Sequence, residues 1–507
     1  MLKNAHIAII GAGPAGLTAA YELTRHGYTP QVLEKGERVG GISRTEVYKG
    51  YHFDIGGHRF YTKVDEISRL WHEVMGEDFL KVPRLSRILY DGKFYRYPLQ
   101  LRDTVFKLGM VESALILWSY LRAQVNPYPV EDTFEQYVVN RFGRRLYDRF
   151  FRIYTEKVWG IPCSQIRADW AAQRIKGLSM VSAVRNALFN TNGGDVKSLI
   201  EEFHYPPLGP GMMWEQFRTI IEARGASVQT GIDVREISLD GKRVSHIVTR
   251  HDGETTTQPV DALINSMALR QLIDRIDPAP PPVVIDAAHR LQYRDFIMVC
   301  LIVDAPNLFP DNWLYIHSPQ VRVGRVQNFK NWSSAMLPDP TKTSIGMEYF
   351  CSKGDDLWSM ADADLLALAA TEMQQLGLAS ASMVEDGTVV RQLRAYPTYD
   401  EHYMQNVGVI RHYLDDITNL QTIGRNGLHR YNNQDHSMLT GMLAARNLMG
   451  ESHDLWSVNT ERSYYEEFAT TAKQPAPTAP LSEDADAGVD VQAVADTARE
   501  QPSAHNQ

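Results

Sequence analysis

The feature that most constrains this chain is a glycine-rich turn directly behind its first apolar segment. Residues 7–10 read Ile-Ala-Ile-Ile, and residues 11–16 read Gly-Ala-Gly-Pro-Ala-Gly. The apolar run is typical of a buried parallel strand, and a helical pattern follows the glycines. Gly11 permits the tight turn, Gly13 lets a phosphate approach the backbone, and Gly16 permits close packing of helix on strand. The turn therefore predicts a strand–helix unit whose helix N-terminus binds phosphate.

An acidic residue completes this pattern one strand later. Residues 32–34 read Val-Leu-Glu, and Glu34 stands where the second strand is expected to end. A carboxylate at that place accepts hydrogen bonds from ribose hydroxyls. Strand, glycines, helix and acid occur in register, which favours a dinucleotide site over a glycine-rich turn in an ordinary α/β protein. Pro14, Ala15 and Lys35 belong to the same predicted site.

Length and composition exclude several classes of protein. A chain of 507 residues predicts two or more domains, and a net charge of −9 argues against a general nucleic-acid binder. Cys163, Cys300 and Cys351 lie far apart without metal-type spacing, which predicts reduced, buried thiols and no metal site. No apolar run approaches the length of a membrane span, and the strand at Ile7 leaves no room for a signal peptide. We therefore expect a cytoplasmic protein that crosses no membrane.

The chain from Asp65 to about Ile200 is expected to be mainly helical. Thr133 is a suitable N-cap for a long amphipathic run. Apolar and aromatic residues recur along that run at i, i+3 and i+4 spacing, which we interpret as core packing. These residues are Phe134, Tyr137, Val138, Phe142, Leu146 and Phe150.

The second half of the chain mixes helices with strands. A helix is expected over Met213–Ala223, ended by the glycine that closely follows it. Residues 227–239 and 244–250 are typical of two strands joined by a hairpin at Asp240-Gly241. Further expected elements are a strand at 262–266 that returns to the first sheet, a β-rich region from the prolines at 278–282 to about 394 with a helix at 362–375, a strand at 420–423, and a helix at 434–449.

These elements predict an α/β fold with a discontinuous, Rossmann-type cofactor domain, in which Val234 also contributes to the cofactor site. The cofactor domain is expected to comprise residues 1–75, 200–270 and 405–471. The inserted parts are expected to be a mainly helical substrate or cap region at 76–199 and an antiparallel β-sheet substrate domain at 271–404. Residues 472–507 are rich in Pro, Ala and Asp and are expected to be a disordered tail.

The N-terminal motifs together resemble a known group of flavoproteins. Gly11–Gly16 with Glu34, followed by Gly40-Gly41, is similar to the opening of flavoproteins with two dinucleotide-binding domains. Amine oxidases, protoporphyrinogen oxidases, phytoene desaturases and UDP-galactopyranose mutases share that opening. The resemblance implies an FAD cofactor and no particular reaction.

Four later stretches resemble UDP-galactopyranose mutases, particularly the longer eukaryotic type. Gly56-Gly57-His58 is similar to the segment that places a histidine beside the flavin ring. The strongest likeness is Gly424-Arg425, followed by Tyr431 and the run Asn433–Ser437. The other two stretches are Trp313-Leu314-Tyr315 with Arg325 and residues 331–333, and Tyr396-Pro397.

The resemblance implies roles for the matched residues. Arg325 and Arg425 would bind a substrate diphosphate, and Tyr315, Tyr396 and Tyr431 could each donate an O–H to a phosphate oxygen. With His58, the two arginines are the catalytic candidates. The remaining substrate-binding candidates are Trp159, Trp313 and Asn433. On the cofactor side, the flavin would lie against Gly41, Gly57, His58, Gly424, Gln434, Asp435, His436 and Ser437.

The sequence also departs from the mutase pattern. The family's Asn-x-x-x-Trp pattern appears here as Thr-Glu-Lys-Val-Trp at residues 155–159, so one expected polar contact is replaced. The central helical region does not match closely either. Both departures fall where a nucleotide and a sugar would bind, so they bear on the identity of the substrate more than on the chemistry.

A flavin-dependent mutase acting on a nucleotide sugar is the leading hypothesis. Converting a pyranose to a furanose requires ring opening, which an intact glycosyl diphosphate does not permit. Reduced FAD offers its N5 as a nucleophile that displaces the diphosphate from the anomeric carbon without net redox change, and NAD(P)H is a candidate reductant. Arg325 and Arg425 would neutralise the departing diphosphate. The sugar, the nucleotide, a lipid-linked alternative substrate and a homo-oligomeric state are left open.

Other interpretations compete with this one. The same opening fits an FAD-dependent oxidase or desaturase, and a non-enzymatic flavoprotein is a third possibility. His58 also fits a hydrogen-bonded loop histidine, and Trp313 fits a core residue. The run Asp435-His436-Ser437 does not predict a hydrolase, because the members of a catalytic triad converge from separate loops.

Overall fold

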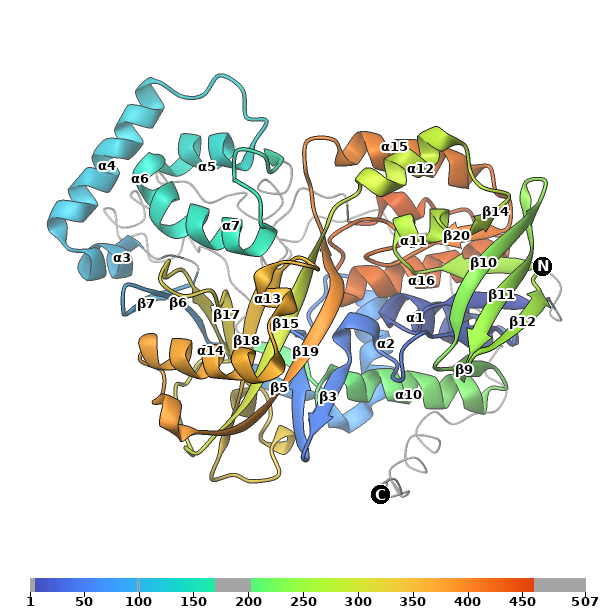
Figure 1. The fold of residues 1–507 in the computed structure, drawn as a ribbon, viewed down its shortest axis with the longest axis horizontal. Coiled ribbons are helices and arrows are strands. Elements are labelled where there is room, and N and C mark those ends of the chain that lie inside the picture. The colour runs from blue at the N-terminus through green and yellow to red at the C-terminus, as the bar shows by residue number, and fades with distance from the viewer. Residues whose placement is uncertain (1–4, 98, 100, 169–201, 460–507) are drawn as a thin grey trace.

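The computed structural model describes residues 5–97, 99, 101–168 and 202–459. The expected tail at 472–507 and part of the expected helical region, 169–199, lie outside these residues. A Rossmann-type half holds both the first and the last described strand–helix units, and a second half consists of a mostly antiparallel sheet, with one parallel strand pair, and a helical cap (Figure 1). No helix among the described residues is long and apolar enough to span a bilayer.

A five-stranded parallel sheet forms the centre of the Rossmann-type half. Its strands run in the order β20-β13-β1-β2-β9. The bounds are β1 Ile7–Ile10, β2 Gln31–Leu33, β9 Ser227–Gln229, β13 Ala262–Asn265 and β20 Leu420–Thr422. The predictions that 262–266 returns to the first sheet and that 420–423 forms a strand are confirmed.

The apolar run of β1 is explained by burial on both faces. Ile9 packs into a core formed with α1 (Pro14–Arg25), α10 (Pro210–Ala223) and α16 (Gln434–Leu448). Ala8 and Ile10 point into a second core formed with α11 (Leu269–Ile273), α12 (Pro282–Arg290) and α15 (Tyr403–Asp415). Because parallel strands covered on both faces need apolar residues at every position, the strand has no polar alternation.

The predicted hairpin in the middle section is confirmed, with one correction. β10 (Asp233–Asp240) and β11 (Arg243–His251) pair antiparallel, in a sheet of order β12-β11-β10-β14. The prediction of one strand over 227–239 is wrong, because β9 leaves to join the parallel sheet and the chain turns at Gly231, whose φ is +73°. The bounds of β12 and β14 are Glu254–Pro259 and Ile276–Asp277.

A seven-stranded sheet of order β19-β15-β18-β17-β16-β6-β7 forms the second half. Its later strands confirm the predicted β-rich region. The helix predicted at 362–375 is α14 (Asp362–Gln375), and it covers one face of the sheet (Figure 1). The bounds are β15 Tyr293–Val303, β16 Trp313–Ile316, β17 Arg325–Asn328, β18 Thr343–Cys351, β19 Val384–Pro397, β6 Ser86–Tyr90 and β7 Lys93–Arg96.

The expectation that residues 65–200 are mainly helical is wrong over residues 80–96, which form three strands. β6 pairs parallel with β16, and β7 pairs antiparallel with β6, so both strands extend the large sheet. β5 (Leu80–Pro83) pairs with β8 (Glu202–Tyr205) instead. β5 and β6 pair with strands distant in the sequence, which a local helical pattern does not reveal, whereas β6 and β7 form a local hairpin whose Asp91-Gly92 turn signal was missed.

The helical cap follows β7. Thr133 forms a capping box with Gln136 at the start of α5 (Phe134–Phe142), which confirms the predicted N-cap. The predicted long run is broken at Gly143 and continues as α6 (Arg144–Tyr147), a π-helical turn and α7 (Ile153–Trp159). All six residues of the predicted stripe are buried in one core, as interpreted. The cap also contains α3 (Leu101–Leu108) and α4 (Met110–Val125).

The remaining described elements connect these layers. They are β3 Thr45–Tyr48, β4 Tyr51–Asp54, α2 Asp65–Met75 and α13 Asp356–Ser359. All three cysteines are buried and free, as predicted. The predicted helix at 213–223 begins three residues earlier, at Pro210, and the helix at 434–449 is α16.

Candidate active site

A cavity of about 2200 Å³ lies at the carboxyl ends of the parallel strands. Three residues that directly follow parallel strands line it: Gly11 after β1, Glu34 after β2 and Ser266 after β13. Gly424, just beyond β20, lines it as well. Ligands of open α/β sheets bind at this edge. The cavity exceeds the roughly 300–1,000 Å³ typical of one small ligand, so it has room for a dinucleotide and a second molecule.

The glycine turn leaves no space for side chains. Gly11 has φ +96°, and a Cβ atom there would lie 2.2 Å from the Ser266 Oγ. A Cβ at Gly16 would lie 1.9 Å from the carbonyl oxygen of Gly11, so the start of α1 sits directly on the turn. The Cα of Gly41 closes the same cradle beside Gly13. The N-terminus of α1, with Pro14 in its first turn, therefore faces the cavity as a bare backbone surface suited to phosphate.

Glu34 holds the turn together from the end of β2. One carboxylate oxygen accepts a hydrogen bond from Ala12 N at 2.8 Å, and the other accepts one from Gly36 N at 2.7 Å. Lys35 forms an ion pair with Asp233 at 3.2 Å, and Val234 lies beside it in the cavity lining. The structure thus brings the predicted nucleotide-binding residues together at one end of the cavity.

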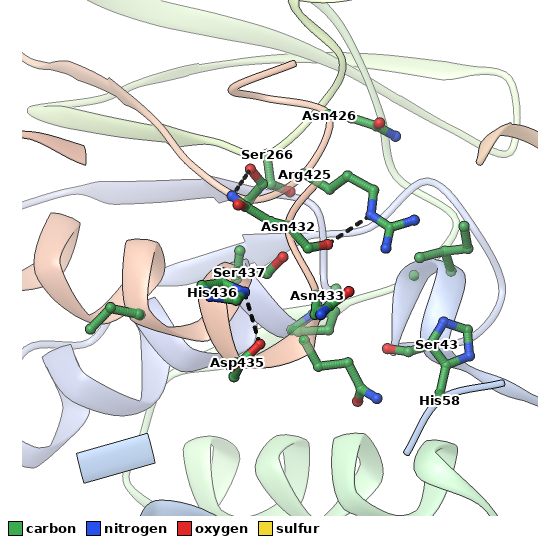
Figure 2. Close-up of a pocket in the computed structure, with 18 of the residues that line it drawn as sticks. Ser43, His58, Ser266, Arg425, Asn426, Asn432, Asn433, Asp435, His436 and Ser437 are labelled. Atoms are coloured by element: carbon green, nitrogen blue, oxygen red, sulfur yellow. Dashed lines mark hydrogen bonds and ion pairs between the residues drawn. The ribbon is translucent and has the colours of Figure 1, made fainter. Parts of the chain in front are cut away.

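The opposite end collects residues from the loop after β4, from α16 and from the loop after β20. His58 is half-buried there, and its Nδ1, which is itself buried, has no hydrogen-bond partner among the described residues. Burial, reinforced by the charges of Arg425 and Arg325, lowers the pKa of His58 to about 3, so its ring is neutral. Figure 2 shows His58 on the opposite side of the cavity from the first turn of α16.

The first turn of α16 lines the cavity with polar side chains. Asn433 is its N-cap residue, and Gln434, Asp435, His436 and Ser437 follow (Figure 2). The His436 Nδ1 lies 3.0 Å from the Asp435 carboxylate. Gly424, with φ +82°, places its Cα close to Ala15, so the loop after β20 meets the glycine turn.

These residues fit FAD. The cradle accepts a pyrophosphate, the Glu34 end accepts a nucleoside, and the His58 end offers an unpartnered ring nitrogen and a second helix N-terminus. Helix N-termini stabilise negative charge, which a reduced flavin carries on its ring. The cavity extends without interruption from one end to the other.

Arg325 is held rigidly beside the His58 end. Its Nε lies 2.6 Å from the Glu348 carboxylate, and its Nη2 donates a hydrogen bond to the Tyr396 hydroxyl at 2.7 Å. Burial acts to lower the pKa of Arg325, but the fully buried Glu348 raises it above its usual value, so the guanidinium stays charged. Burial raises the pKa of Tyr396 to about 12, so its hydroxyl stays protonated.

Arg425 lies across the cavity on the loop after β20. Its Nε donates to the carbonyl of Asn432 at 2.8 Å (Figure 2), and its Nη1 donates to the carbonyl of Ala395 at 2.9 Å. The guanidinium stands 4.7 Å from the ring centre of Tyr431 and 5.5 Å from that of Tyr396. The two tyrosine rings stack at 5.6 Å, so they form one wall between the two arginines.

The predicted aromatic residues divide into two groups. Trp313 and Tyr315 both line the cavity. The ring centre of Trp313 also lies 5.4 Å from that of Trp332, so Trp313 belongs to the hydrophobic core as well as to the cavity lining. Trp159 is different. It lies behind Tyr396 and Tyr431, with ring centres 6.4 and 6.1 Å away, and it is not part of the cavity lining.

Sequence reasoning missed residues that hold this site in place. Glu348 pairs with Arg325. Gln327, which lines the cavity, donates a hydrogen bond to the Glu348 carboxylate at 2.7 Å. A single charge within the apolar run of β18 was a usable signal for Glu348, because a buried carboxylate needs a partner. Arg394, another lining residue, has the left-handed φ of +53°, and its sequence carries no signal for that conformation.

Comparison with known proteins agrees with this geometry. Residues 14–413 match the family described as flavin containing amine oxidoreductase. The chain belongs to this family.

Individual relatives of this amine oxidoreductase family member include mutases and oxidoreductases. The solved structure of reduced UDP-galactopyranose mutase has a TM-score of 0.78 at 23% identity, covering 92% of this chain and 100% of that one, which shows a common fold. The "Probable UDP-galactopyranose mutase" of Klebsiella pneumoniae is 26% identical over 33% of this chain and 44% of its own length. A 4,4'-diapophytoene desaturase of Methylomonas sp is 36% identical over 18% of this chain and 19% of its own. The matched stretches thus span less than half of either curated relative.

Proposed function

We propose that this flavoprotein is a mutase that interconverts the pyranose and furanose forms of a nucleotide sugar, with UDP-galactose as the reference substrate. The observation that carries this proposal is the pair Arg325 and Arg425, which converge with Tyr396 and Tyr431 in the cavity that also holds the flavin site. Two guanidiniums facing one space match the two phosphates of a nucleoside diphosphate, since each can bind phosphate oxygens bidentately.

The two arginines are suited to stabilise a departing diphosphate. Glu348 fixes Arg325, and two backbone carbonyls fix Arg425, so neither guanidinium must reorganise as negative charge grows. Preorganised donors of this kind are typically worth about 3–4 kcal/mol each in the transition state. A diphosphate held in this way can leave the anomeric carbon and return to it without leaving the cavity.

The tyrosine pair supplies neutral donors beside the charges. Tyr396 accepts a hydrogen bond from Arg325, which leaves its own O–H available for a phosphate oxygen. Because its pKa is raised to about 12, this O–H remains a donor throughout the physiological range. Tyr431 stacks on Tyr396 and under Arg425, so it fixes the distance between the two charged groups.

A reduced flavin bound here would supply a nucleophile for the anomeric carbon with no net redox change. His58 stays neutral because of burial and the two nearby arginines, so it adds no positive charge that would compete for the diphosphate. Its Nδ1 is available to accept or donate a hydrogen bond at the flavin edge. NAD(P)H is the proposed reductant.

An FAD-dependent oxidoreductase is the second candidate. Family membership and the desaturase match favour it, because both belong to proteins named for redox reactions. An amine or polyene substrate gives no reason for two fixed guanidiniums in the cavity, which is why the mutase is preferred.

Turnover decides between the two candidates. The purified, FAD-loaded full chain is reduced with dithionite or NAD(P)H and incubated with UDP-galactofuranose, and conversion to UDP-galactopyranose is followed by chromatography. The proposal predicts conversion by the reduced protein and none by the oxidised one. Absence of turnover with any UDP- or TDP-sugar would overturn it, and substrate-dependent oxygen or quinone consumption by an amine or polyene would establish the oxidoreductase.

A further inference from the structure

A buried amide oxygen borders the cavity without a hydrogen-bond partner. It belongs to Gln327 on β17, a residue that lines the cavity and whose exposed fraction is only 1%. The Gln327 Oε1 accepts no hydrogen bond from any described residue. Because a buried polar atom without a partner costs stability, such an atom beside a cavity indicates a hydrogen-bond donor on the ligand.

The orientation of this amide is set by Glu348. The Gln327 Nε2 donates a hydrogen bond to the Glu348 Oε1 at 2.7 Å. A carboxylate held against the Arg325 guanidinium only accepts hydrogen bonds, so the amide nitrogen must face Glu348 and the amide oxygen must point away from it. Glu348 is fully buried, so water does not compete for this contact. The Gln327 side chain therefore presents a fixed acceptor to whatever binds beside it.

Gln327 lies between the two parts of the site that the proposed reaction brings together. It follows Arg325 by two residues on β17, so both side chains project from the same face of the strand, about 6–7 Å apart along it. On its other side, a Cβ atom at Gly57 would lie 3.0 Å from the Gln327 Nε2 and 3.6 Å from its Oε1. Arg325 is the proposed diphosphate ligand, and Gly57 directly precedes His58 at the flavin end of the cavity.

The group between a diphosphate and a flavin is the sugar. In the proposed reaction the flavin reacts at the carbon that carries the diphosphate, so the sugar ring must lie between them. An ionised diphosphate has no O–H to donate, whereas every sugar hydroxyl has one. Trp313 stands directly opposite Gln327 in the β16–β17 pair and also lines the cavity. An indole beside a fixed acceptor suits a ring with apolar C–H faces and hydroxyls at its edge.

We propose that Gln327 is a specificity-determining residue, whose amide oxygen accepts a hydrogen bond from one hydroxyl of the sugar. This inference rests on the proposed function, which supplies the positions of the diphosphate and the flavin. It narrows the substrate class to sugars that keep this hydroxyl unsubstituted. The corresponding deoxysugar would leave the Gln327 Oε1 buried without a donor, which lowers affinity by about 10–100-fold.

Ligand binding to the oxidised, FAD-loaded full chain tests this contact without turnover. Titration calorimetry gives Kd for UDP-galactopyranose, for its 2-, 3-, 4- and 6-deoxy analogues, and for UDP. The wild type is expected to bind one deoxy analogue about 10–100-fold more weakly than the parent sugar nucleotide. Gln327→Met, which has a similar length and no amide, is expected to bind the parent and that analogue equally. Equal discrimination by wild type and variant, or no discrimination by the wild type, would overturn the proposal.

UDP separates the sugar contact from an effect on Arg325. A variant that disturbs Arg325 through Glu348 weakens UDP and UDP-galactopyranose together, whereas loss of the sugar contact weakens only UDP-galactopyranose. Equal weakening of the two ligands in Gln327→Met would therefore overturn the proposal. Gln392→Met is the matched control. This second glutamine of the cavity lining already accepts a hydrogen bond from Arg44 at 2.9 Å through its Oε1, so the variant should discriminate as the wild type does.

The flavin is the competing partner of the Gln327 oxygen. A shifted flavin reduction potential in Gln327→Met, with unchanged discrimination among the sugar analogues, would assign the oxygen to the flavin and overturn the proposal. Failure of the wild type to bind either UDP or UDP-galactopyranose would contradict the proposed function itself and remove this inference with it. Binding of both ligands without discrimination would leave the proposed function standing and overturn only the role of Gln327.

Discussion

At the scale of single residues, the site depends on buried charges whose partners come from separate strands. Glu348 on β18 and Tyr396 on β19 both contact Arg325 on β17. Arg394 takes a left-handed backbone conformation that costs a non-glycine residue about 1–3 kcal/mol. Its N–H donates to Asp295 at 2.7 Å, and the resulting turn directs the carbonyl of Ala395 to Arg425. The backbone strain at Arg394 is thus offset by hydrogen bonds that also orient the carbonyl of Ala395 toward Arg425.

Replacing Arg425 by Ala should lower kcat/KM for a UDP-sugar by about 10²–10³-fold, because a preorganised donor to the departing diphosphate is lost. Arg411→Ala is the matched control, since this exposed arginine pairs with Asp415 and Asp454, lies over the Trp456 ring and does not line the cavity. The control should retain activity within a factor of two or so. Steady-state kinetics with reduced protein measure both. A loss of less than tenfold in Arg425→Ala would show that the diphosphate is bound elsewhere.

Asp54 should make stability depend on pH. It is fully buried, and burial raises its pKa from 3.8 to about 7 against the hydrogen bonds from Tyr205 and Thr45. The folded state therefore keeps a proton that the unfolded state loses. Stability from this group is fully present below about pH 4 and is lost as the pH rises to about 7.

Denaturant unfolding of wild type and Asp54→Asn measures this effect. The free energy of unfolding of the wild type should fall relative to the variant by roughly 4 kcal/mol between the two pKa values. Parallel curves for the two proteins across this range would mean that Asp54 titrates normally.

At the scale of elements, the local sequence pattern was enough to predict those helices, strands and turns whose formation depends on neighbouring residues in the chain. The β1 turn, the Thr133 cap and the hairpin at Asp240-Gly241 follow from nearby chemistry, and all are present. β6 was missed although Asp91-Gly92 joins it to β7 as a hairpin, and only its pairing with β16, more than two hundred residues away, lies beyond local pattern. Among site residues, glycines and motif arginines were found, whereas Glu348 and Arg394 act through tertiary pairing and backbone strain. The local sequence pattern does not show which strands or charged side chains pair with partners far away in the chain.

The crossing of α1 and α16 should depend on Gly441. A Cβ there would lie 2.0 Å from the carbonyl oxygen of Ala15, so Gly441→Ala must push α16 away from the glycine turn. The variant should lose most of its bound flavin and unfold with less denaturant. Gly408→Ala is the control, because this glycine in α15 has open space around its Cα and should gain about 0.4–1 kcal/mol. Flavin absorbance per protein measures the bound flavin of each variant, and the denaturant midpoint measures its stability. Equal flavin content in the two variants would contradict the close crossing.

At the scale of the whole molecule, the cavity links parts of the chain that are far apart in sequence. The parallel sheet takes strands from residues 7–33, 227–265 and 420–422, and Arg425 follows the last of them, whereas Arg325 comes from β17 of the second sheet. A ligand that spans the cavity therefore contacts both halves at once. Its binding free energy contributes to the folding of both, because no single segment holds the site alone.

FAD should accordingly raise the melting temperature of the whole chain rather than of one half. At a free FAD concentration of about 100 times Kd, mass action adds about 2.7 kcal/mol to the stability of the folded state. Differential scanning calorimetry of the apoprotein with and without FAD measures the shift. Riboflavin, which lacks the phosphates and the adenosine, cannot fill the glycine cradle and should stabilise less. Gly441→Ala should respond weakly to either ligand, since its cradle is displaced. An unchanged melting temperature with FAD, or a shift confined to one of two separate transitions, would contradict a site shared by both halves.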